Sequence, residues 1–181
     1  MESSKIQLNK QILNYGELSP KIDSTVYIAP GALIIGDVTI GKDSSVWYNT
    51  VVRGDVNYIT IGEQTNIQDG TVIHVTNGKF PTHIGSKVTI GHLACLHGCT
   101  IHDLCLIGMN ATVLDGAIVE ERSMVAAGTL VRQGFTVPSG KLVAGVPGKV
   151  IRDLTKEELE FLEISAQNYL GYAEKTRNSI S

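Results

Sequence analysis

The chain has 181 residues, of which 43% are hydrophobic and 18% are charged, and its formal net charge is −3 at pH 7. These values fit one globular domain with its own core, and the acidic balance provides no basic patch for nucleic acid. No apolar run is long enough to span a bilayer, so we expect neither a nucleic-acid partner nor a membrane partner.

The N-terminal sequence, MESSKIQLNK, lacks the apolar core of a signal peptide. The chain contains an odd number of cysteines, Cys95, Cys99 and Cys105, which favours reduced thiols over a disulfide framework. We therefore expect a cytoplasmic protein, while import into a mitochondrion or another compartment stays open. Residues 1–27 show little periodicity, and we interpret them as a segment that caps the repeat that follows.

From residue 28 to residue 135, aliphatic side chains recur every six positions, as in Ile28, Ile34, Ile40, Val46 and Val52. A period of six fits neither a helix nor a continuous strand, but it fits a short strand plus a turn, repeated. Three such units form one triangular coil of about 18 residues, so the pattern predicts an all-β solenoid. A β-sandwich with coincidental spacing is the alternative, and the length of the register disfavours it.

Two segments interrupt or follow the repeat. Residues 76–82, TNGKFPT, form an insertion that should leave the coil as a loop beside a candidate site, where loops are often functional. Residues 136–154 read as a connection rich in glycine and proline. Residues 155–176 predict a helix, because Thr155 and Glu158 form a capping box and an apolar stripe follows. We expect this stripe to pack on the solenoid or on a neighbouring subunit.

Three histidines fall within this repeat. His74 and His97 each follow a core aliphatic residue by one position, so they occupy equivalent places in their units. One coil plus the loop separates them, which predicts that they stack about 5 Å apart on one face. His92 follows Ile90 by two positions and lies on another face.

Three imidazoles are a common ligand set for zinc, with a fourth position open to water. One chain would not close these three on one ion, but a symmetric homotrimer would bring a neighbour's His92 to His74 and His97. The sequence therefore predicts a metal shared between subunits. The alternative is that all three are solvated surface histidines, as we expect of His83 and His102, which lack this phase.

Polar residues surround these histidines in two motifs, VVRGDV and TNIQDG. Asn66 and Gln68 could orient a metal-bound water, and the carboxylates of Asp55 and Asp69 could hold Arg53 across an interface. The alternative for Arg53 is an ion pair with either carboxylate that only fixes the trimer.

Several motifs together resemble those of the γ-class carbonic anhydrase family, including its ferripyochelin-binding-protein-like and PaaY-like members. They are RGD at 53–55, TNIQD at 65–69, GH at 91–92, LHGC at 96–99, IGM at 107–109 and GVPGKVIR at 145–152. The resemblance implies a left-handed parallel β-helix, a homotrimer, and zinc (iron or cobalt in some members). His74 and His97 of one subunit and His92 of the next would hold the ion. Handedness comes from the resemblance alone, because parallel crossovers are otherwise right-handed.

The activity that the resemblance implies is the reversible hydration of CO2 to bicarbonate by a zinc-bound hydroxide, a carbonate dehydratase (lyase) reaction. Gln68 matches the residue that orients the hydroxide, and Asn66 matches the one that helps to place the substrate. Arg53, Asp55 and Asp69 match the interface network. Tyr169, or else Tyr172, matches a tyrosine of the C-terminal helix that lines the site.

The chain departs from the archaeal members at the step that exports a proton. Val56 stands where they have a glutamate after RGD, and the 76–82 loop has no carboxylate, so fast hydration lacks an assigned shuttle. Two other functions stay open. One is an acyltransferase that uses a coenzyme A thioester with one histidine as the general base, because GVPGKVIR also resembles the terminal motif of such enzymes. The other is a silent trimer that the metal merely holds together.

Overall fold

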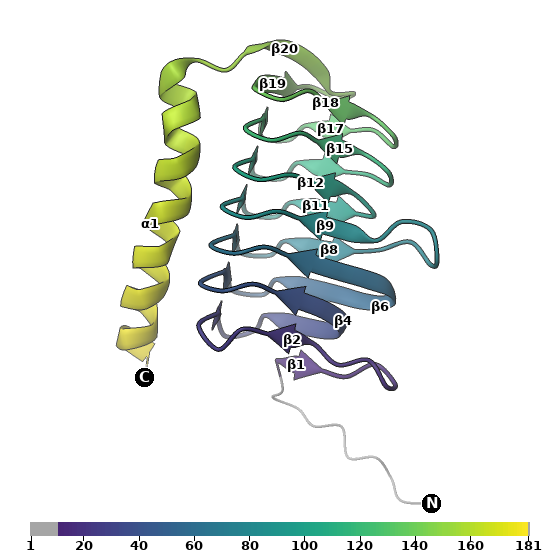
Figure 1. Ribbon diagram of the computed structural model, residues 1–181, viewed down its shortest axis with the longest axis vertical. Coiled ribbons are helices and arrows are strands. Elements are labelled where there is room, and N and C mark those ends of the chain that lie inside the picture. The colour runs from purple at the N-terminus through teal and green to yellow at the C-terminus, as the bar shows by residue number, and fades with distance from the viewer. Residues whose placement is uncertain (1–10, 181) are drawn as a thin grey trace, which may run out of the picture.

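Residues 11–180 are described by the computed structural model, in which short strands and tight corners stack into a parallel β-solenoid (Figure 1). The strands, in chain order, are β1 (Ile12–Leu13), β2 (Lys21–Ile22), β3 (Tyr27–Ile28), β4 (Leu33–Ile40), β5 (Ser45–Val46), β6 (Val51–Ile61), β7 (Asn66–Ile67), β8 (Val72–His74), β9 (Thr82–Ile84), β10 (Thr89–Ile90), β11 (Cys95–His97), β12 (Thr100–Ile101), β13 (Leu106–Ile107), β14 (Thr112–Val113), β15 (Ile118–Val119), β16 (Met124–Val125), β17 (Leu130–Val131), β18 (Thr136–Val137), β19 (Lys141–Ala144) and β20 (Lys149–Asp153). One helix, α1 (Lys156–Ile180), follows them.

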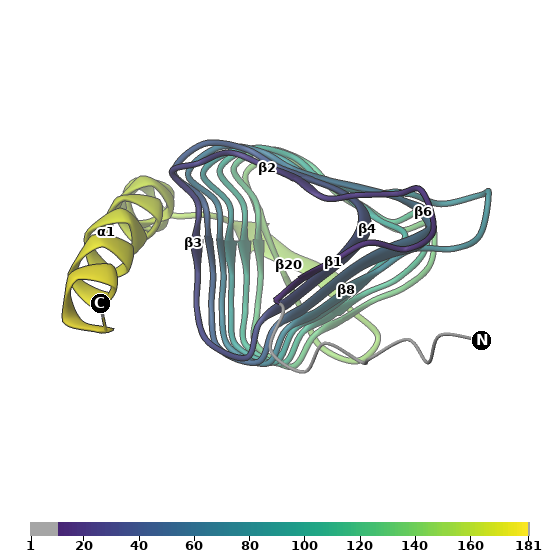
Figure 2. The same ribbon diagram turned by 90° about the horizontal axis from the view of Figure 1, so that it is seen from below.

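The coil has a triangular cross-section (Figure 2). Seen from the N-terminal end, the chain runs from β2 at the top to β3 at the left and then through β4, anticlockwise as it recedes from the viewer. The coil is therefore left-handed, and the predicted fold class is confirmed. One sheet, containing β6, β8 and β9, wraps two sides of the triangle, and the sheet from β3 to β20 forms the third.

The six-residue period places one aliphatic side chain per side in the interior of each coil. Parallel pairing then aligns these side chains into three columns along the axis. The columns are Ile34, Val52, Ile73, Leu96, Val113 and Val131; Ile40, Ile61, Ile84, Ile101, Val119 and Val137; and Val46, Ile67, Ile90, Ile107, Val125 and Val143, all of them buried. Each such side chain contributes roughly 1.5–3 kcal/mol through the apolar surface it removes from water.

The solenoid extends beyond the limits of 28 and 135 that the hexapeptide register suggested. β1 and β2 pair in parallel with β4, and β18 and β19 continue the coil past residue 135. Val137 and Val143 still follow the six-residue spacing and are buried in the columns, so the repeat continues into the segment interpreted as a connection, whose glycines and prolines obscure it in the sequence.

The helix α1 runs antiparallel to the direction in which the coils stack and lies along the face formed by β3, β5 and β10 (Figure 1). Leu162, Ala166 and Ala173 are buried against that face, so the apolar stripe packs on the solenoid of its own chain. The Ser165 hydroxyl contacts the Thr89 hydroxyl at 2.9 Å, and Arg177 donates to the Thr25 carbonyl at 2.8 Å. Within residues 11–180, no helix has the length and apolar character needed to cross a membrane.

The capping box at the start of α1 forms as predicted. The Glu158 N–H donates to the Thr155 hydroxyl at 3.2 Å, and the Thr155 N–H donates to the Glu158 carboxylate at 2.9 Å. Arg152 donates two further hydrogen bonds to Glu158, at 2.6 and 2.8 Å. The contacts from Arg152 and then from the Thr155 amide lower the pKa of Glu158 to about 2 from 4.5.

We expect Glu158→Gln to reduce stability at neutral pH and to lose this effect in acid. A depressed carboxyl pKa contributes stability that is fully present above about pH 4.5 and is lost as the pH falls towards 2. The melting temperatures of wild type and variant should therefore differ at pH 7 and converge near pH 2. Glu160→Gln is the control, since Glu160 makes only an exposed 3.8 Å pair with Lys156. A difference between wild type and Glu158→Gln that persists unchanged at pH 2 would contradict this account.

The three cysteines are free thiols, of which Cys99 and Cys105 are buried and Cys95 is partly buried. Burial raises the pKa of Cys99 and of Cys105 to about 12 and raises that of the half-buried Cys95 less far. Because the thiolate is the reactive species, we expect a thiol reagent to modify at most Cys95 in the native protein and all three after denaturation. Mass spectrometry of the alkylated peptides checks this, and rapid native labelling of Cys105 would refute it.

Candidate metal centre

Two histidines stack one coil apart on the side formed by β6, β8, β11 and β14. β8 and β11 pair in a register that sets His74 directly opposite His97, although 23 residues separate them. Their ring centroids lie 5.1 Å apart, and His74 Nδ1 lies 3.1 Å from His97 Nε2. The loop therefore leaves the coil without disturbing the alignment of the two rings.

A carboxylate contacts the outer nitrogen of each ring. His74 Nε2 lies 2.9 Å from Asp55 Oδ1, and His97 Nδ1 lies 2.6 Å from Asp115 Oδ1. These contacts place a proton on each outer nitrogen, so in the neutral rings both inner nitrogens present lone pairs to each other. Two nitrogens that both carry lone pairs repel at 3.1 Å unless both bind a common cation.

The same spacing fits two ligands of one metal ion. Two nitrogens that each lie 2.0–2.1 Å from a tetrahedral zinc ion are about 3.4 Å apart, close to the 3.1 Å between His74 Nδ1 and His97 Nε2. Carboxylate-oriented imidazoles are also the usual outer-shell arrangement of metal-binding histidines. The residues present thus fit two of the three expected ligands.

Both carboxylates are ionised more readily than usual. Partial burial opposes ionisation of Asp55, but hydrogen bonds from His74 and Arg53 hold its pKa below the ordinary value. Partial burial likewise opposes ionisation of Asp115, and hydrogen bonds from His97 and Thr76 lower its pKa. Each histidine therefore faces a charged acceptor at neutral pH.

The third histidine, His92, lies in the turn that follows β10, away from the face that carries the histidine pair, as its position in the repeat predicted. Its Nδ1 lies 2.7 Å from Asp69 Oδ2, and Asp69 Oδ1 accepts from the Tyr48 N–H at 3.1 Å. This leaves Nε2 of His92 free to act as a ligand. Within residues 11–180 of one chain, no three His, Cys, Asp or Glu side chains form a group that could hold an ion alone.

The two amides Asn66 and Gln68 lie near His92 rather than near the histidine pair. Gln68 Nε2 donates to Asn66 Oδ1 at 3.1 Å, and Asn66 Nδ2 donates to the Thr89 hydroxyl at 3.0 Å. Thr89 in turn contacts Ser165 of α1. A hydrogen-bonded series from the helix therefore fixes the side chain of Gln68.

Tyr169 of α1 lies on the same side of the molecule. It lines a cavity of about 300 Å³ together with Gln68, Thr89 and His92, and its ring meets Trp47 edge-on at 5.5 Å. Burial, and then the charge of Asp69, raise the pKa of Tyr169, so its hydroxyl remains a proton donor at neutral pH. Tyr172, the other candidate, is 52% exposed and lines an adjacent pocket that His92 also borders.

One chain thus carries two separate groups of candidate residues, which we name the first and the second half-site. The first contains Arg53, Asp55, His74 and His97, in which Arg53 pairs with Asp55. The second contains Asn66, Gln68, Asp69, His92 and Tyr169. Asp69 contacts His92 of its own chain, so a contact between Asp69 and Arg53 of a neighbouring subunit stays a prediction.

Sequence reasoning missed Asp115 and its partner Thr76, which donates to Asp115 Oδ2 at 2.8 Å. A signal was present, because Asp115 stands 18 residues after His97, one coil further on. Of the two histidines assigned to the surface, His83 contacts the Thr60 hydroxyl at 2.8 Å, and the half-exposed His102 lies 3.7 Å from Glu120. Both lie outside the two half-sites.

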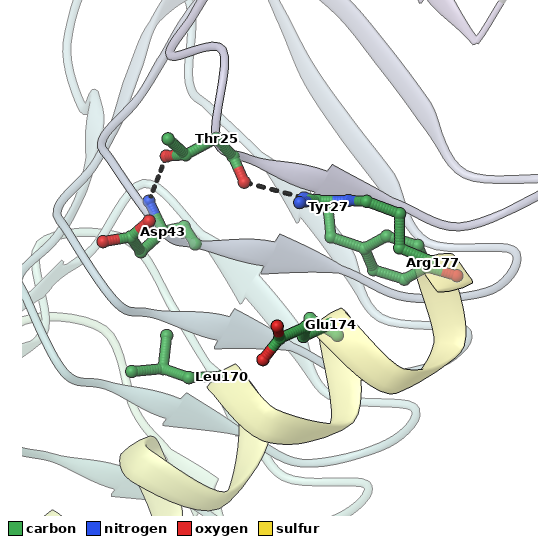
Figure 3. Close-up of a pocket in the computed structure, with 8 residues that line it drawn as sticks. Thr25, Tyr27, Asp43, Leu170, Glu174 and Arg177 are labelled. Atoms are coloured by element: carbon green, nitrogen blue, oxygen red, sulfur yellow. Dashed lines mark hydrogen bonds between the residues drawn. The ribbon is translucent and has the colours of Figure 1, made fainter. Parts of the chain in front are cut away.

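A different pocket lies between the last turns of α1 and the first coils (Figure 3). Thr25 accepts from the Asp43 N–H through its hydroxyl and from Arg177 through its carbonyl. Tyr27 lines the same pocket, and its buried hydroxyl has no hydrogen-bond partner in the described part of the chain. The contacts in this pocket hold the end of the helix against the coil. No histidine is among the residues that line the pocket.

Proteins named as carbonic anhydrases are similar to this chain in sequence. A Methanocaldococcus jannaschii protein named "Probable carbonic anhydrase" is 51% identical over 153 residues, which cover 84% of this chain and 96% of that protein. "Gamma carbonic anhydrase 2, mitochondrial" of Arabidopsis thaliana is 49% identical over 171 residues, which cover 92% of this chain. The match spans 62% of the length of that Arabidopsis protein, and 64% of the length of the related "Gamma carbonic anhydrase 1, mitochondrial".

The fold has solved counterparts as well. The crystal structure of a hexapeptide transferase family protein from Anaplasma phagocytophilum matches with a TM-score of 0.87 and 49% identity, covering 91% of this chain and 96% of that one. No family model matches the chain.

Proposed function

The chain belongs to the γ carbonic anhydrase family, and from this premise we propose that it hydrates CO2 reversibly to bicarbonate at a metal centre shared between subunits of a homotrimer. We propose zinc as the metal, with iron or cobalt as the alternatives that imidazole ligands also suit. When bound, such an ion acts as a Lewis acid that makes water a nucleophile at neutral pH.

The observation that carries this proposal is the matched orientation of the three histidines. One ring nitrogen of each of His74, His97 and His92 lies within 2.9 Å of a carboxylate oxygen, an arrangement that would place the proton there and keep the lone pair on the other nitrogen. In the first half-site, two of these lone pairs face each other at 3.1 Å. A neighbouring subunit that supplies His92 would complete three ligands and leave a fourth position for water.

The second half-site supplies groups that suit a small, neutral substrate. Gln68 is held by Asn66 through its amide nitrogen, so its side-chain oxygen is available to accept a hydrogen bond from the attacking water. Asn66 would assist the placement of CO2 through the same pair. The Tyr169 hydroxyl, which stays protonated because its pKa is raised, would donate a hydrogen bond to the developing bicarbonate oxygen.

Arg53, Asp55 and Asp69 would form the network at the subunit interface. Arg53 is 42% exposed at its side chain while it pairs with Asp55, so its remaining N–H donors are free to meet Asp69 of a neighbouring subunit. Such a contact would connect the carboxylate that orients His74 with the one that orients His92. We propose that this network fixes the register of the subunits and thereby the distance between the half-sites.

Proton export lacks two acidic groups, one after RGD and one in the 76–82 loop. Val56 is partly exposed beside the first half-site, and the loop that follows His74 carries Thr76 and Lys79 but no acid. We therefore propose that soluble buffer accepts the proton, and we expect the hydration rate to rise with the concentration of a buffer such as imidazole.

Acyl transfer from a coenzyme A thioester is the second candidate, which the named transferase-family neighbour favours. A transferase of this kind needs one histidine as the general base, whereas three carboxylate-oriented histidines fit a ligand set better. A trimer in which the metal is only structural is the third candidate.

Elemental analysis of protein prepared without chelators tests these functions, together with stopped-flow CO2 hydration and an acetyl-CoA assay. We expect about one zinc, iron or cobalt ion per chain and hydration that a chelator abolishes. Metal-free protein with acyl transfer would support the second candidate. Bound metal without hydration at any buffer concentration would support the third.

The compartment also remains a proposal. We propose a cytoplasmic location, because the three cysteines are free thiols and disulfides are rare in the cytoplasm. The Arabidopsis relatives carry the word "mitochondrial" in their names. Fractionation of cells that produce the natural protein, with immunodetection, distinguishes these locations, and recovery in the mitochondrial fraction would overturn the cytoplasmic assignment.

A further inference from the structure

We propose that Asp115 is a positioning residue that fixes the ring of His97 for metal binding, and that the loop of residues 76–82 exists to hold Asp115 in place. This inference rests on the proposed function, because it assigns a role toward the same metal. It adds to that function a carboxylate, a glycine and a loop that have no role in the hydration step itself.

The two oxygens of Asp115 have separate partners. Oδ1 accepts from His97 Nδ1 at 2.6 Å, and Oδ2 accepts from the Thr76 hydroxyl at 2.8 Å. The first contact selects the tautomer in which His97 Nε2 keeps its lone pair, and Nε2 is the atom that faces His74. The second contact prevents the carboxylate from turning away, so Thr76 acts on His97 through Asp115.

The backbone beside His97 is shaped for this contact. Gly98 has a φ of +55°, and a Cβ at this position would lie 2.5 Å from Asp115 Oδ1 and 2.7 Å from Phe80 Cβ. Any other residue would therefore push away either the carboxylate or the loop. The Gly98 N–H donates to the His74 carbonyl at 3.1 Å, which ties the same turn to the other histidine of the pair.

The loop is built to close over this turn. The Thr76 N–H donates to the Phe80 carbonyl at 2.9 Å, and the Phe80 ring covers Gly116, where a Cβ would meet it at 3.0 Å. Thr82 donates to the His74 carbonyl at 2.7 Å. The loop thus leaves the coil after His74, carries Thr76 to Asp115 and returns to the coil beside the same histidine.

Asp115→Ala tests this inference through metal affinity, measured by competition between the trimeric protein and a zinc-binding dye. We expect zinc binding about 10–100-fold weaker than in wild type, which is the usual effect of losing an outer-shell partner. Asp115→Asn keeps an oxygen that can accept from His97 Nδ1, so its loss should be smaller. Thr76→Val should weaken binding less than Asp115→Ala, because it removes only the second contact.

Asp103→Ala is the matched control, since this carboxylate caps the Ser86 N–H at another corner at 2.7 Å. Its zinc affinity should equal that of wild type. Imidazole nitrogen NMR of the metal-free proteins gives a readout that a purely structural role would not change. We expect His97 to carry its proton on Nδ1 in wild type and to lose this preference in Asp115→Ala.

The outcomes separate the inference from the proposed function. Wild-type zinc affinity and an unchanged His97 tautomer in Asp115→Ala would overturn the role of Asp115 while leaving the metal site intact. Wild-type protein that takes up no metal would instead overturn the proposed function. The tautomer of His97 would still decide, in that case, whether Asp115 orients the ring.

Discussion

The His92→Ala variant is expected to lose its metal and its hydration activity while its coil still folds. His92 lies in the turn between β10 and β11, apart from the strands that carry His74 and His97, so its removal leaves their stacked pair intact. Loss of a direct ligand should weaken metal binding by more than about 100-fold, the upper effect of disturbing only an outer-shell partner. His83→Ala is the control, since that ring contacts Thr60 outside both half-sites.

Mixed trimers give the sharpest version of this prediction. A subunit with His92→Ala still offers His74 and His97, and a subunit with His97→Ala still offers His92. Random mixing of the two inactive variants in equal amounts, by coexpression, should restore about one quarter of the wild-type metal content, because each mixed trimer regains one of its three interfaces.

The matched negative control is the mixture of His74→Ala with His97→Ala. Both substitutions damage the same half-site, so no arrangement of these subunits assembles a complete ligand set. Restored metal in this control, or none in the His92→Ala and His97→Ala mixture, would rule out a centre shared between subunits in the proposed way. Size-exclusion chromatography must show equal trimer content in all samples.

Truncation of the buried column is expected to have the largest effect on stability. Ile101 is 1% exposed and lies between Ile84 and Val119 of the adjacent coils. Ile101→Ala should lower the free energy of unfolding by about 2–5 kcal/mol, since the rigid coil cannot collapse onto the cavity. Urea unfolding at a fixed protein concentration measures this.

Ile164→Ala is the control for the type of substitution, because it removes the same atoms from a side chain of α1 that is 52% exposed. We expect a change within about 0.5 kcal/mol there. Equal effects at Ile101 and Ile164 would show that the internal columns do not dominate the stability of the solenoid.

The coil could be predicted from the sequence because its interior is filled by residues at a fixed sequence spacing. One aliphatic residue per six positions is enough to specify the columns, and this signal is visible in Ile28, Ile34 and Ile40 without any knowledge of distant contacts. The ends could not be placed in the same way. β1 joins the solenoid by pairing with β4 without contributing to the three columns, and the glycines and prolines around β19 obscure the period that Val143 continues.

The candidate site was predictable to a different degree in each half. The stacking of His74 on His97 follows from phase alone, once the loop is treated as an insertion, and the structure places them in that register. Asp115 escaped prediction because a single carboxylate in a corner is ordinary in a repeat of this kind. Its role depends on the side-chain direction and on the space beside Gly98, neither of which the spacing encodes.

The helix α1 changes how the whole repeat array should unfold. Stacked repeats touch only their neighbours, so an uncovered array can fray from either end in steps. Here a 25-residue rod returns along the stack and joins positions as far apart as Arg177 and Thr25, 152 residues away in sequence. The first coils therefore cannot open without also losing their contacts with the end of this helix, which opposes fraying from that end of the array.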